Sequence, residues 1–557
     1  MSVPAIAANA VWSAVAQGAR RRFRAALREP RSTQQALLVG YLTRNARTDF
    51  GRQADFAALL EAGSPADIVA AYQEAVPVRS YDDFDRLIGR VAAGEGEVLT
   101  ADPVLRLAPS SGSTTAAKLV PQTATSAREF SRAVDAWIGD LYRRSPSLLG
   151  GQAYWSITPA ISFEAIAAAR LGDRAGRPAV PVGFDDDAAY LGGLRRKLVD
   201  AILAVPNAVR LVTHPDVFQY VTLLFLLRAR SLRLISVWHP SFLLHLLESI
   251  DRWRDRLAGD VADGTLTPPG PITSDLLARL HRGLTPDRQR ASQIRGSSAR
   301  DLASLWPGLT IVSCWGDGPA QPYARRLAQS LPHATVQPKG LIATEGIVSI
   351  PFDGRHPLAI GSHFFEFVDA RGRPHLADAL SEGEEYDVVL TTGGGLYRYA
   401  LGDRITVTGW LDGTPSIAFA GRSDRVSDRF GEKLSDGFVS SVLAQIFAAG
   451  APPRFAMLAP ETTEAGVAYT LLVEPEDALP DRLDASLERA LRQNPHYAWC
   501  VDLGQLRPAR VVRVGPHADR AYLDACVARG QRLGDVKPAS LHREEGWEAR
   551  LAPTTWT

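Results

Sequence analysis

Residues 110–118 read Ser-Ser-Gly-Ser-Thr-Thr-Ala-Ala-Lys and lie between two short apolar runs, Val104–Leu107 and Leu119–Val120. This pattern predicts a strand, a loop and a second strand. Glycine lets the backbone approach an anion closely, and hydroxyls, exposed N–H groups and a lysine can all bind phosphate oxygens. The loop is not a Walker A motif, because G-x-x-x-x-G-K-[ST] is absent. Taken alone, it could equally be a Ser/Thr-rich surface turn.

The composition excludes several classes of protein. A chain of 557 residues is longer than one hydrophobic core usually supports, so two or more domains are expected. The 61 acidic and 62 basic residues nearly cancel, so no overall charge favours nucleic acid or an anionic membrane. The three cysteines are too widely spaced for a disulfide framework or a metal cluster. The histidines show no zinc-binding spacing.

No segment predicts export or membrane insertion. Residues Met1–Ala19 are apolar but lack a basic stretch in front of them, so we expect an amphipathic helix docked on the body. The apolar run Val221–Leu227 is too short to span a bilayer. We therefore expect a cytoplasmic protein that binds neither nucleic acid nor a membrane, and that is a monomer or a weak homodimer.

The order of apolar patterns indicates an α/β part followed by an α+β part. The first 80 residues have helical spacing, and strands then alternate with helices. The predicted strands of this α/β part are Tyr154–Thr158, Leu232–Val237, Leu309–Cys314 and Ala334–Val336. From about residue 355, short strands follow one another between glycine turns. We expect a large domain over residues 1–425, with a β-barrel-like strand-rich part, and a small mobile α+β domain over 426–557, joined by a hinge.

Two further segments offer oxygen ligands. Thr344 and Glu345 place a hydroxyl beside a carboxylate, a natural contact for magnesium and phosphate; a helix N-cap at Thr344 is the alternative. In Leu396–Asp403, an aspartate follows a glycine at a strand end and can accept both hydroxyls of a ribose. The tyrosines of that segment offer ring faces to a base or to packing, and a β-turn aspartate is the alternative there.

A fourth segment, Gly421–Asp428, runs into Phe430-Gly431-Glu432-Lys433 at the predicted domain boundary. It is either a polar linker or a hinge whose arginine and lysine meet a nucleotide bound between the domains. Each of the four segments is weak alone, and their order along the chain is what carries information.

This order resembles the adenylate-forming superfamily and, within it, the auxin-responsive promoter (Gretchen Hagen) family of acyl acid–amido synthetases. The family loop Ser-Ser-Gly-Thr-Ser-x-x-x-x-Lys is similar to Ser110–Lys118, which is one residue shorter, and Tyr-Arg-Tyr-x-x-Gly-Asp is matched at Tyr397–Asp403. The segments Arg233–Leu247 and Pro307–Pro351 look like bacterial members. The resemblance covers roughly residues 30–545 and implies a large adenylate-forming domain with a small mobile C-terminal domain.

The resemblance implies a role for each matched position. The residues implied to bind ATP are Ser110, Ser111, Gly112, Ser113, Thr114, Lys118, Thr344, Tyr397, Asp403 and Arg422, with Asp403 at the ribose and Glu345 at magnesium. The residues implied to line the acid are Trp155, Trp238, His239 and Trp315. Two small-domain lysines, Lys433 and Lys537, are alternatives for neutralising the adenylate. His239 is expected to be a wall or helix-start residue and not a base.

The implied reaction is the ATP-dependent adenylation of a carboxylic acid, with release of pyrophosphate, followed by transfer to an amine or amino acid. Magnesium and basic side chains would stabilise the transferring phosphoryl group, so positioning suffices and no Ser-His-Asp set is needed. The alternatives are a thiol acceptor such as coenzyme A and a non-catalytic nucleotide-binding homologue. Ala343 and Ala400 stand where plant members carry serine and arginine or lysine, so the plant substrate preferences are not carried over.

Overall fold

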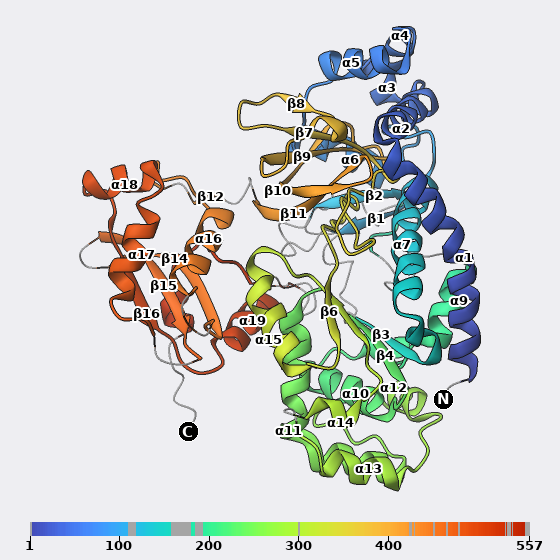
Figure 1. Ribbon diagram of the computed structural model, residues 1–557, viewed down its shortest axis with the longest axis vertical. Helices are drawn as coiled ribbons and strands as arrows, with labels where there is room; N and C mark the ends of the chain where they lie inside the picture. Colours follow the sequence, from blue (N-terminus) through green and yellow to red (C-terminus); the bar gives the residue numbers. More distant parts are fainter. Residues whose placement is uncertain are drawn as a thin grey trace.

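The computed structural model describes residues 3–109, 118–156, 180–183, 193–298, 301–422, 426–427, 429–448, 450, 452–463, 466–476, 479–529, 531, 536 and 538–551. Helices, a parallel sheet, an antiparallel sheet and a C-terminal unit follow one another along the chain (Figure 1). The predicted combination of an α/β part with an α+β part is confirmed. Among the described residues, we find no helix of the length and apolarity that a bilayer crossing requires.

The N-terminal helices lie beside the two sheets and above the antiparallel one (Figure 1). They are α1 (Val3–Arg28), α2 (Pro30–Asn45), α3 (Asp49–Gln53), α4 (Phe56–Leu60), α5 (Pro65–Ala75), α6 (Asp82–Ala92), α7 (Ala124–Arg144) and α9 (Gly193–Ile202), with 3-10 turns η1 (Pro146–Gly150) and η4 (Asn207–Leu211). Helix α1 packs along α7 and α9 through a buried stripe that recurs every three or four residues from Ala5 to Leu27. Gly139 of α7 permits this close approach, because a Cβ there would lie 2.6 Å from the carbonyl oxygen of Ala16.

A four-stranded parallel sheet lies below the antiparallel sheet in Figure 1. Its strands, in spatial order, are β3 (Gln152–Trp155), β4 (Leu232–Ser236), β5 (Ile311–Cys314) and β6 (Thr335–Pro338). Neighbouring residues alternate between two cores: Leu234 and Ile311 pack with α1 and α7, whereas Ile235 and Val312 pack with α10 and α11. Both faces are thus covered, which explains the continuous apolar runs in these strands.

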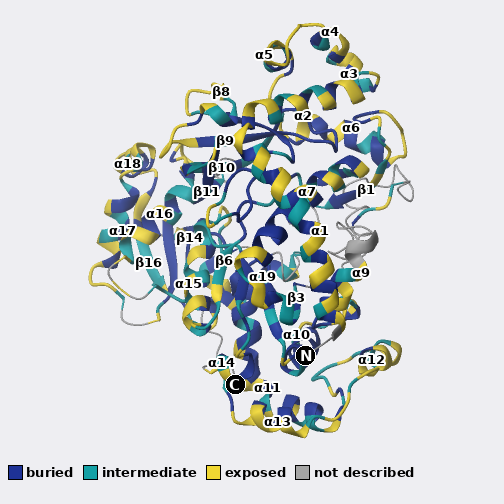
Figure 2. Ribbon diagram, turned by 45° about the vertical axis from the view of Figure 1, so that its right-hand side comes forward, coloured by how far each residue is buried: buried dark blue, intermediate teal, exposed yellow. Residues whose placement is uncertain are grey.

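The helices on the second face of this sheet belong to the segment between residues 207 and 331. They are α10 (Pro215–Arg228), α11 (Pro240–Asp263), α12 (Ser274–His281), α13 (Arg288–Arg295), α14 (Leu302–Leu305) and α15 (Gln321–Ser330), with the 3-10 turn η5 (Gly318–Ala320) before α15. Helices α12 and α13 lie at the surface with exposed faces (Figure 2), whereas α10 is buried.

The strand-rich part, expected to resemble a barrel, is a five-stranded antiparallel sheet with two edges. Its spatial order is β11 (Thr414–Arg422), β10 (Tyr399–Leu411), β9 (Glu385–Thr391), β7 (Phe364–Val368) and β8 (Pro374–His375), with the 3-10 turn η6 (Ala377–Ala379) beside it. A separate antiparallel pair, β1 (Val104–Pro109) and β2 (Leu119–Thr123), brackets residues 110–117, so the strands predicted on either side of that loop are present.

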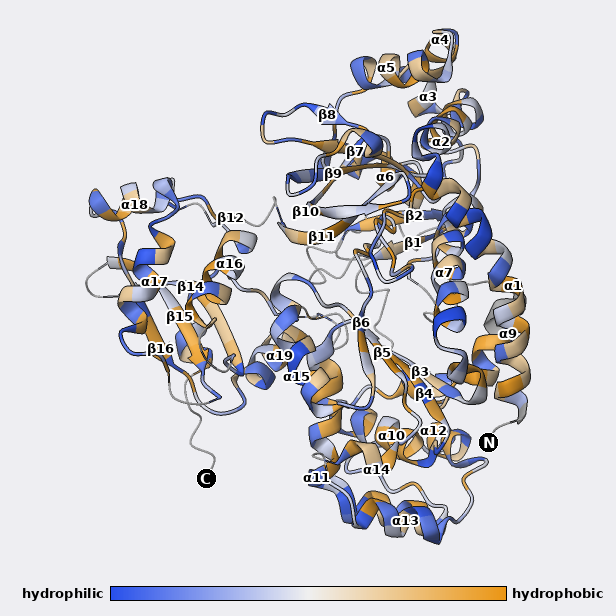
Figure 3. Cartoon of the chain, in the orientation of Figure 1, coloured by the Kyte–Doolittle hydropathy of each residue, from blue (hydrophilic) through white to orange (hydrophobic). Residues whose placement is uncertain are grey.

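The C-terminal unit consists of a small sheet with helices on both faces. Its elements are β12 (Val426–Ser427), β13 (Leu434–Ser435), α16 (Asp436–Ile446), β14 (Phe455–Thr463), β15 (Gly466–Glu474), α17 (Leu483–Leu491), α18 (Pro495–Asp502), β16 (Arg507–Arg513), α19 (Ala518–Ala528) and α20 (Trp547–Arg550). Strands β14 and β15 are largely apolar (Figure 3), and together with β16 they supply one core with α16 and α17 and a second core with α19 and α20.

Polar contacts join this unit to the large part. His245 Nε2 of α11 lies 3.4 Å from Asp519 Oδ2 of α19, and Arg520 lies 3.4 Å from Asp216 of α10. Arg326 of α15 donates a hydrogen bond to the carbonyl of Arg454, at 3.4 Å.

The hydrophobic cores of the two parts are separate. Among the described residues, the buried clusters of the large part end at Leu331 and Phe419, and those of the C-terminal unit begin at Leu434 and Phe455. No such cluster therefore has buried members from both parts. Each part has its own core, as expected of two domains.

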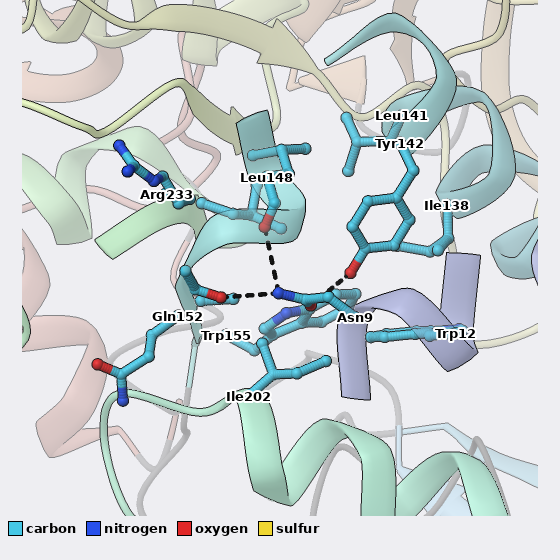
Figure 4. Close-up of a pocket in the computed structure, with 13 residues that line it drawn as sticks. Asn9, Trp12, Ile138, Leu141, Tyr142, Leu148, Gln152, Trp155, Ile202 and Arg233 are labelled. Atoms are coloured by element: carbon cyan, nitrogen blue, oxygen red, sulfur yellow. Dashed lines mark hydrogen bonds between the residues drawn. The ribbon is translucent and has the colours of Figure 1, made fainter. Parts of the chain in front are cut away.

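Asn9 fastens α1 to the amino-terminal edge of the parallel sheet (Figure 4). Its Nδ2 donates to the carbonyls of Leu148 and Gly151, at 3.1 and 2.8 Å, and its Oδ1 accepts from the Tyr142 hydroxyl at 2.7 Å. The cavity beside it measures about 10 Å³, room for about one water molecule. We therefore interpret this place as packing and not as a ligand site.

A buried ion pair joins the antiparallel sheet to α5. Arg398 donates to both carboxylate oxygens of Glu366, at 2.9 and 3.0 Å, and also to the carbonyls of Gln73 and Val76, at 2.6 and 2.5 Å. The two charged side chains are 5% and 1% exposed. A buried pair with its remaining donors satisfied in this way is hard to disrupt at one end, because the other charge would be left uncompensated.

Replacing Arg398 by methionine should therefore lower the free energy of unfolding by about 3–5 kcal/mol, because the Glu366 carboxylate would stay buried without an opposite charge and keep only the hydrogen bond from Gln73 Nε2. The matched control is Arg404→Met, which removes the half-exposed ion pair with Asp387 on the same sheet and should cost at most about 1 kcal/mol. Urea unfolding measures both. Equal losses of unfolding free energy in the two variants would contradict the interpretation of Arg398 and Glu366 as a buried, stabilising ion pair.

Candidate functional site

Three segments that are far apart in the sequence meet at the start of β10. Lys118 precedes β2, Tyr399 opens β10, and Glu345 lies in the turn after β6. The Lys118 ammonium donates to the Tyr399 hydroxyl at 3.1 Å, and that hydroxyl donates to Glu345 Oε1 at 3.0 Å. Burial, followed by the Glu345 charge, raises the pKa of Tyr399 far above its ordinary value, so the phenol stays protonated. The result is a cation and a carboxylate held apart by one hydroxyl.

The segment that carries Glu345 is a tight turn. Ala343 and Gly346 exchange backbone hydrogen bonds at 3.0 and 3.3 Å, and Ile342 pairs with Ile347 in an isolated bridge. No helix begins at Thr344, so the alternative of a helix N-cap is wrong. The turn instead presents Thr344 and Glu345 next to the start of β10.

Glu129 of α7 holds the chain behind this turn. Its carboxylate accepts hydrogen bonds from the Tyr41 hydroxyl at 2.6 Å and from the Gly393 N–H at 3.1 Å, and it lies 3.2 Å from His363 Nδ1. His363 Nε2 accepts the N–H of Ile347 at 3.2 Å, so this histidine ties the Glu345 turn to the neighbourhood of Glu129. A Cβ at Gly393 would lie 2.4 Å from Glu129 Oε1, so only glycine fits there.

Asp403 and Arg422 face each other across β10 and β11. They are register partners, and Arg422 Nη1 lies 3.1 Å from Asp403 Oδ1. The register shifts between Ala400 and Arg404 on one side of β10 and again directly after Arg404 on the other. Such irregularities re-aim side chains at strand ends near functional sites. The structure therefore brings two of the predicted nucleotide residues together, Asp403 on the same strand as Tyr399 and Arg422 on the neighbouring strand β11.

The predicted acid-lining residues gather at the carboxyl edge of the parallel sheet. Trp155 ends β3, Trp238 follows β4 and Trp315 follows β5, and the N–H of Trp315 donates to the carbonyl of Trp238 at 2.8 Å. His239 is the N-cap of α11, where its Nδ1 accepts the N–H of Ser241 at 3.2 Å, and its ring centroid is 6.0 Å from that of Trp315. His239 is thus a helix-start residue that also packs on the wall, as expected.

Tyr397 requires a correction. The resemblance implies that it contacts the cofactor, but it lies fully buried in the core, stacked on Phe50 at 4.5 Å, with its hydroxyl donating to the carbonyl of Leu99 at 2.8 Å. The following tyrosine of the same motif, Tyr399, is the one in the cluster. Alternation along an extended segment would turn these two side chains the same way, and the left-handed backbone of Arg398, with φ 46°, separates them.

Six of the predicted residues lie outside the described residues, namely Ser110, Ser111, Gly112, Ser113, Thr114 and Lys537. Lys433 is exposed in the turn between β12 and β13 of the C-terminal unit, and its carbonyl accepts from Asn494 Nδ2 at 3.2 Å. No described contact links Lys433 to the cluster at the start of β10.

Lys339 is a candidate that the sequence patterns did not single out. It directly follows β6 at the same carboxyl edge as the tryptophans, is 8% exposed, and donates to Ser236 Oγ at 2.6 Å. The strand-end rule that selected the tryptophans would also have selected this residue. Its burial depends on α7, which packs over it from a distant part of the chain, so spacing alone could not reveal it.

Comparisons with known proteins place the chain in one family along most of its length. The GH3 family N-terminal domain matches residues 19–336, the GH3 family central domain residues 356–422, and the GH3 family C-terminal domain residues 444–545.

Among the relatives, a probable indole-3-acetic acid-amido synthetase of Oryza sativa subsp. japonica is 24% identical over 456 residues, covering 72% of this chain and 70% of the relative. A jasmonoyl–L-amino acid synthetase of Nicotiana attenuata is 24% identical over 383 residues, covering 63% of each chain. The solved structure of the GH3.15 acyl acid amido synthetase matches with a TM-score of 0.80 at 18% identity, over 96% of both chains.

That structural match shows the shared fold, and the match to the N-terminal domain spans more than half of the 557 residues. The predicted resemblance is confirmed, while the bacterial origin stays a prediction. The chain belongs to the GH3 family.

Proposed function

We propose that the chain adenylates a carboxylic acid with ATP and transfers the acyl group to an amine or amino acid, forming an amide. The observation that carries this proposal is the cluster of Lys118, Tyr399 and Glu345, in which Tyr399 is on the same strand as Asp403. A cation for phosphate, a carboxylate for magnesium and an acid for ribose are the groups that a bound nucleotide requires. The relatives named as amido synthetases support an amide as the product.

The residues of the cluster would bind the phosphates in a fixed geometry. Lys118 would donate to phosphate oxygens, together with the hydroxyls of Ser110, Ser111, Ser113 and Thr114 and the backbone at Gly112. Tyr399 holds Lys118 and Glu345 at a set separation, so both charges are positioned before the nucleotide arrives. ATP, when bound, supplies the chemistry that turns the carboxylate into an acyl adenylate, from which an amine displaces AMP.

Glu345 fits a role as magnesium ligand. Tyr399 occupies its Oε1, and no hydrogen bond joins its Oε2 to another described residue. The described residues contain no cluster of three or more metal-ligating side chains, which suits magnesium, because this ion commonly takes one or two protein carboxylates and completes its shell with phosphates and water. Magnesium would neutralise charge on the phosphates while Thr344 contacts the α-phosphate.

The remaining roles concern the ribose, the adenylate and the acid. Asp403 would accept the ribose hydroxyls, and Arg422, already 3.1 Å from it, would contact the nucleotide. Lys433 or Lys537 of the small domain would neutralise the adenylate. The acid would lie along the wall of Trp155, Trp238, His239 and Trp315, whose aromatic rings suit an apolar or aromatic chain.

The direct test measures acid-dependent exchange of pyrophosphate into ATP over a broad panel of acids, and then AMP release with and without added amines. We expect exchange with at least one acid, and AMP release that amines or hydroxylamine accelerate. Acceleration by coenzyme A in place of amines would favour the thiol acceptor. ATP binding without exchange for any acid would refute the enzymatic proposal.

Asp403→Asn should lower exchange about 10–100-fold, because hydrogen bonds to a charged acceptor contribute about 1.5–3 kcal/mol. Asp387→Asn is the control, since Asp387 also forms an ion pair with an arginine of this sheet, Arg404, and no hydrogen bond among the described residues joins it to Lys118, Tyr399 or Glu345. The control should keep wild-type exchange. Full exchange in Asp403→Asn, with an unchanged melting temperature, would overturn the ribose assignment.

Tyr399→Phe and Tyr397→Phe form a matched pair within one motif. Tyr399→Phe removes the hydroxyl between Lys118 and Glu345 and should lower exchange about tenfold with little loss of stability. Tyr397→Phe removes a core hydrogen bond to Leu99 and should lower stability by about 1 kcal/mol with exchange retained. Exchange assays and thermal unfolding of both variants test this prediction. Lost stability with full exchange in Tyr399→Phe would show that the cluster of Lys118, Tyr399 and Glu345 is structural.

A further inference from the structure

Lys339 carries a buried ammonium group for which the described residues supply no carboxylate. Its Nζ donates to Ser236 Oγ at 2.6 Å and lies 3.5 Å from Ser313 Oγ, and the residue is 8% exposed. An ammonium has three donors, and the two serines take at most two of them. A buried charge left in this state is destabilising unless an anion completes it.

Aromatic rings surround this ammonium group on the α7 face of the parallel sheet. The Nζ lies 5.1 Å from the ring of Trp137 and 5.8 Å from that of Trp238. Trp155 and Ser236 are register partners across the strands, and the Trp155 ring centroid is 5.9 Å from that of Trp137. The cation therefore lies at the base of the aromatic wall proposed to line the acid.

The ammonium form persists at neutral pH. Burial lowers the pKa of Lys339 to about 8, which leaves most molecules protonated at pH 7. Among the described residues, the Cys314 thiol on β5 is the titratable group that interacts electrostatically with Lys339. Burial raises the pKa of this thiol to about 12, so the thiol is neutral at pH 7 and gives Lys339 no negative charge. The serines and indoles that face Lys339 from β4, β5 and α7 do not titrate in this range.

Lys339 is not part of the cluster of Lys118, Tyr399 and Glu345. The reacting carboxylate must reach the phosphates near Lys118 and Glu345, at the start of β10, whereas Lys339 is bound to the ends of β4 and β5. No described hydrogen bond connects the two places. An acid that lies along the aromatic wall can therefore have its reacting carboxylate at one place and its opposite end at the other.

We propose that Lys339 binds a second carboxylate at the end of the acyl substrate opposite the reacting one, so that the enzyme selects dicarboxylic acids with an apolar or aromatic middle. This inference rests on the proposed adenylation. In this proposal Lys339 is a specificity determinant, because it touches the substrate but not the reacting atoms. The ammonium would gain the second carboxylate as its missing partner, with the Ser236 and Ser313 hydroxyls holding it in place.

Matched acids and matched variants test this proposal. The acids are 3-phenylpropanoate against 3-(4-carboxyphenyl)propanoate, and hexanoate against adipate; the variants are Lys339→Met, Lys339→Arg and the surface control Lys197→Met. Pyrophosphate exchange in the wild type should favour the diacid of at least one pair at least tenfold in kcat/KM. Lys339→Met should lose about 10–100-fold on that diacid, mainly through KM, and keep or gain activity on the monoacid.

Further readouts separate selectivity from structure. Lys339→Arg should restore part of the diacid preference, Lys197→Met should behave as the wild type, and the wild-type preference should decline above pH 8 as the ammonium loses its proton. A wild type that favours monoacids would overturn the proposal. So would a Lys339→Met variant that loses equally on both acids of a pair, or on neither.

If the wild type exchanges with no acid at all, the proposed function fails, and ligand binding still decides the role of Lys339. Thermal unfolding is then measured with and without the diacids. A rise in the melting temperature of the wild type that is absent in Lys339→Met supports the second-carboxylate site. No rise in either protein, or the same rise in both, overturns it.

Discussion

The buried ion pair between Arg398 and Glu366 fixes the place where β10 begins, and that strand carries both Tyr399, which contacts Lys118 and Glu345, and Asp403, which pairs with Arg422. The guanidinium also binds two carbonyls at the end of α5, so a helix, a turn and a sheet are joined at one residue. Arg398 adopts a left-handed backbone, with φ 46°, which a non-glycine residue keeps only when its surroundings enforce it. The ion pair provides that enforcement.

Three consecutive residues of one motif therefore serve three different purposes. Tyr397 packs in the core, Arg398 forms the ion pair, and Tyr399 separates the Lys118 and Glu345 charges. The neighbouring Glu129 network supports the same region from α7, since it binds both the Gly393 backbone and the histidine behind the Glu345 turn. Buried polar side chains thus hold the backbone around Tyr399 and Glu345 in place.

Much of this arrangement was predictable from sequence, for reasons that differ between its parts. Apolar runs bounded by turns located β4 and β5, and the carboxyl ends of parallel strands share an edge, so Trp238 and Trp315 could be placed together. The roles of the two tyrosines in one motif could not be told apart, because their exposure depends on a backbone angle at Arg398. The burial of Lys339 could not be foreseen either, because nothing local shows that α7 covers it. The short helices α16 and α18 were missed, since neither has a long apolar period.

The joint between the large part and the C-terminal unit includes polar contacts at about the limit of hydrogen-bond length, such as His245 with Asp519 and Arg326 with the Arg454 carbonyl, and a close approach of α16 to β11. Interfaces of this kind resemble transient complexes more than domain cores. No buried hydrophobic cluster of the described residues has members from both parts, so the joint draws no stability from a shared core. Dissolved salt, which screens exposed charges, can therefore weaken the ion pairs of the joint without disturbing either of the two cores of the C-terminal unit.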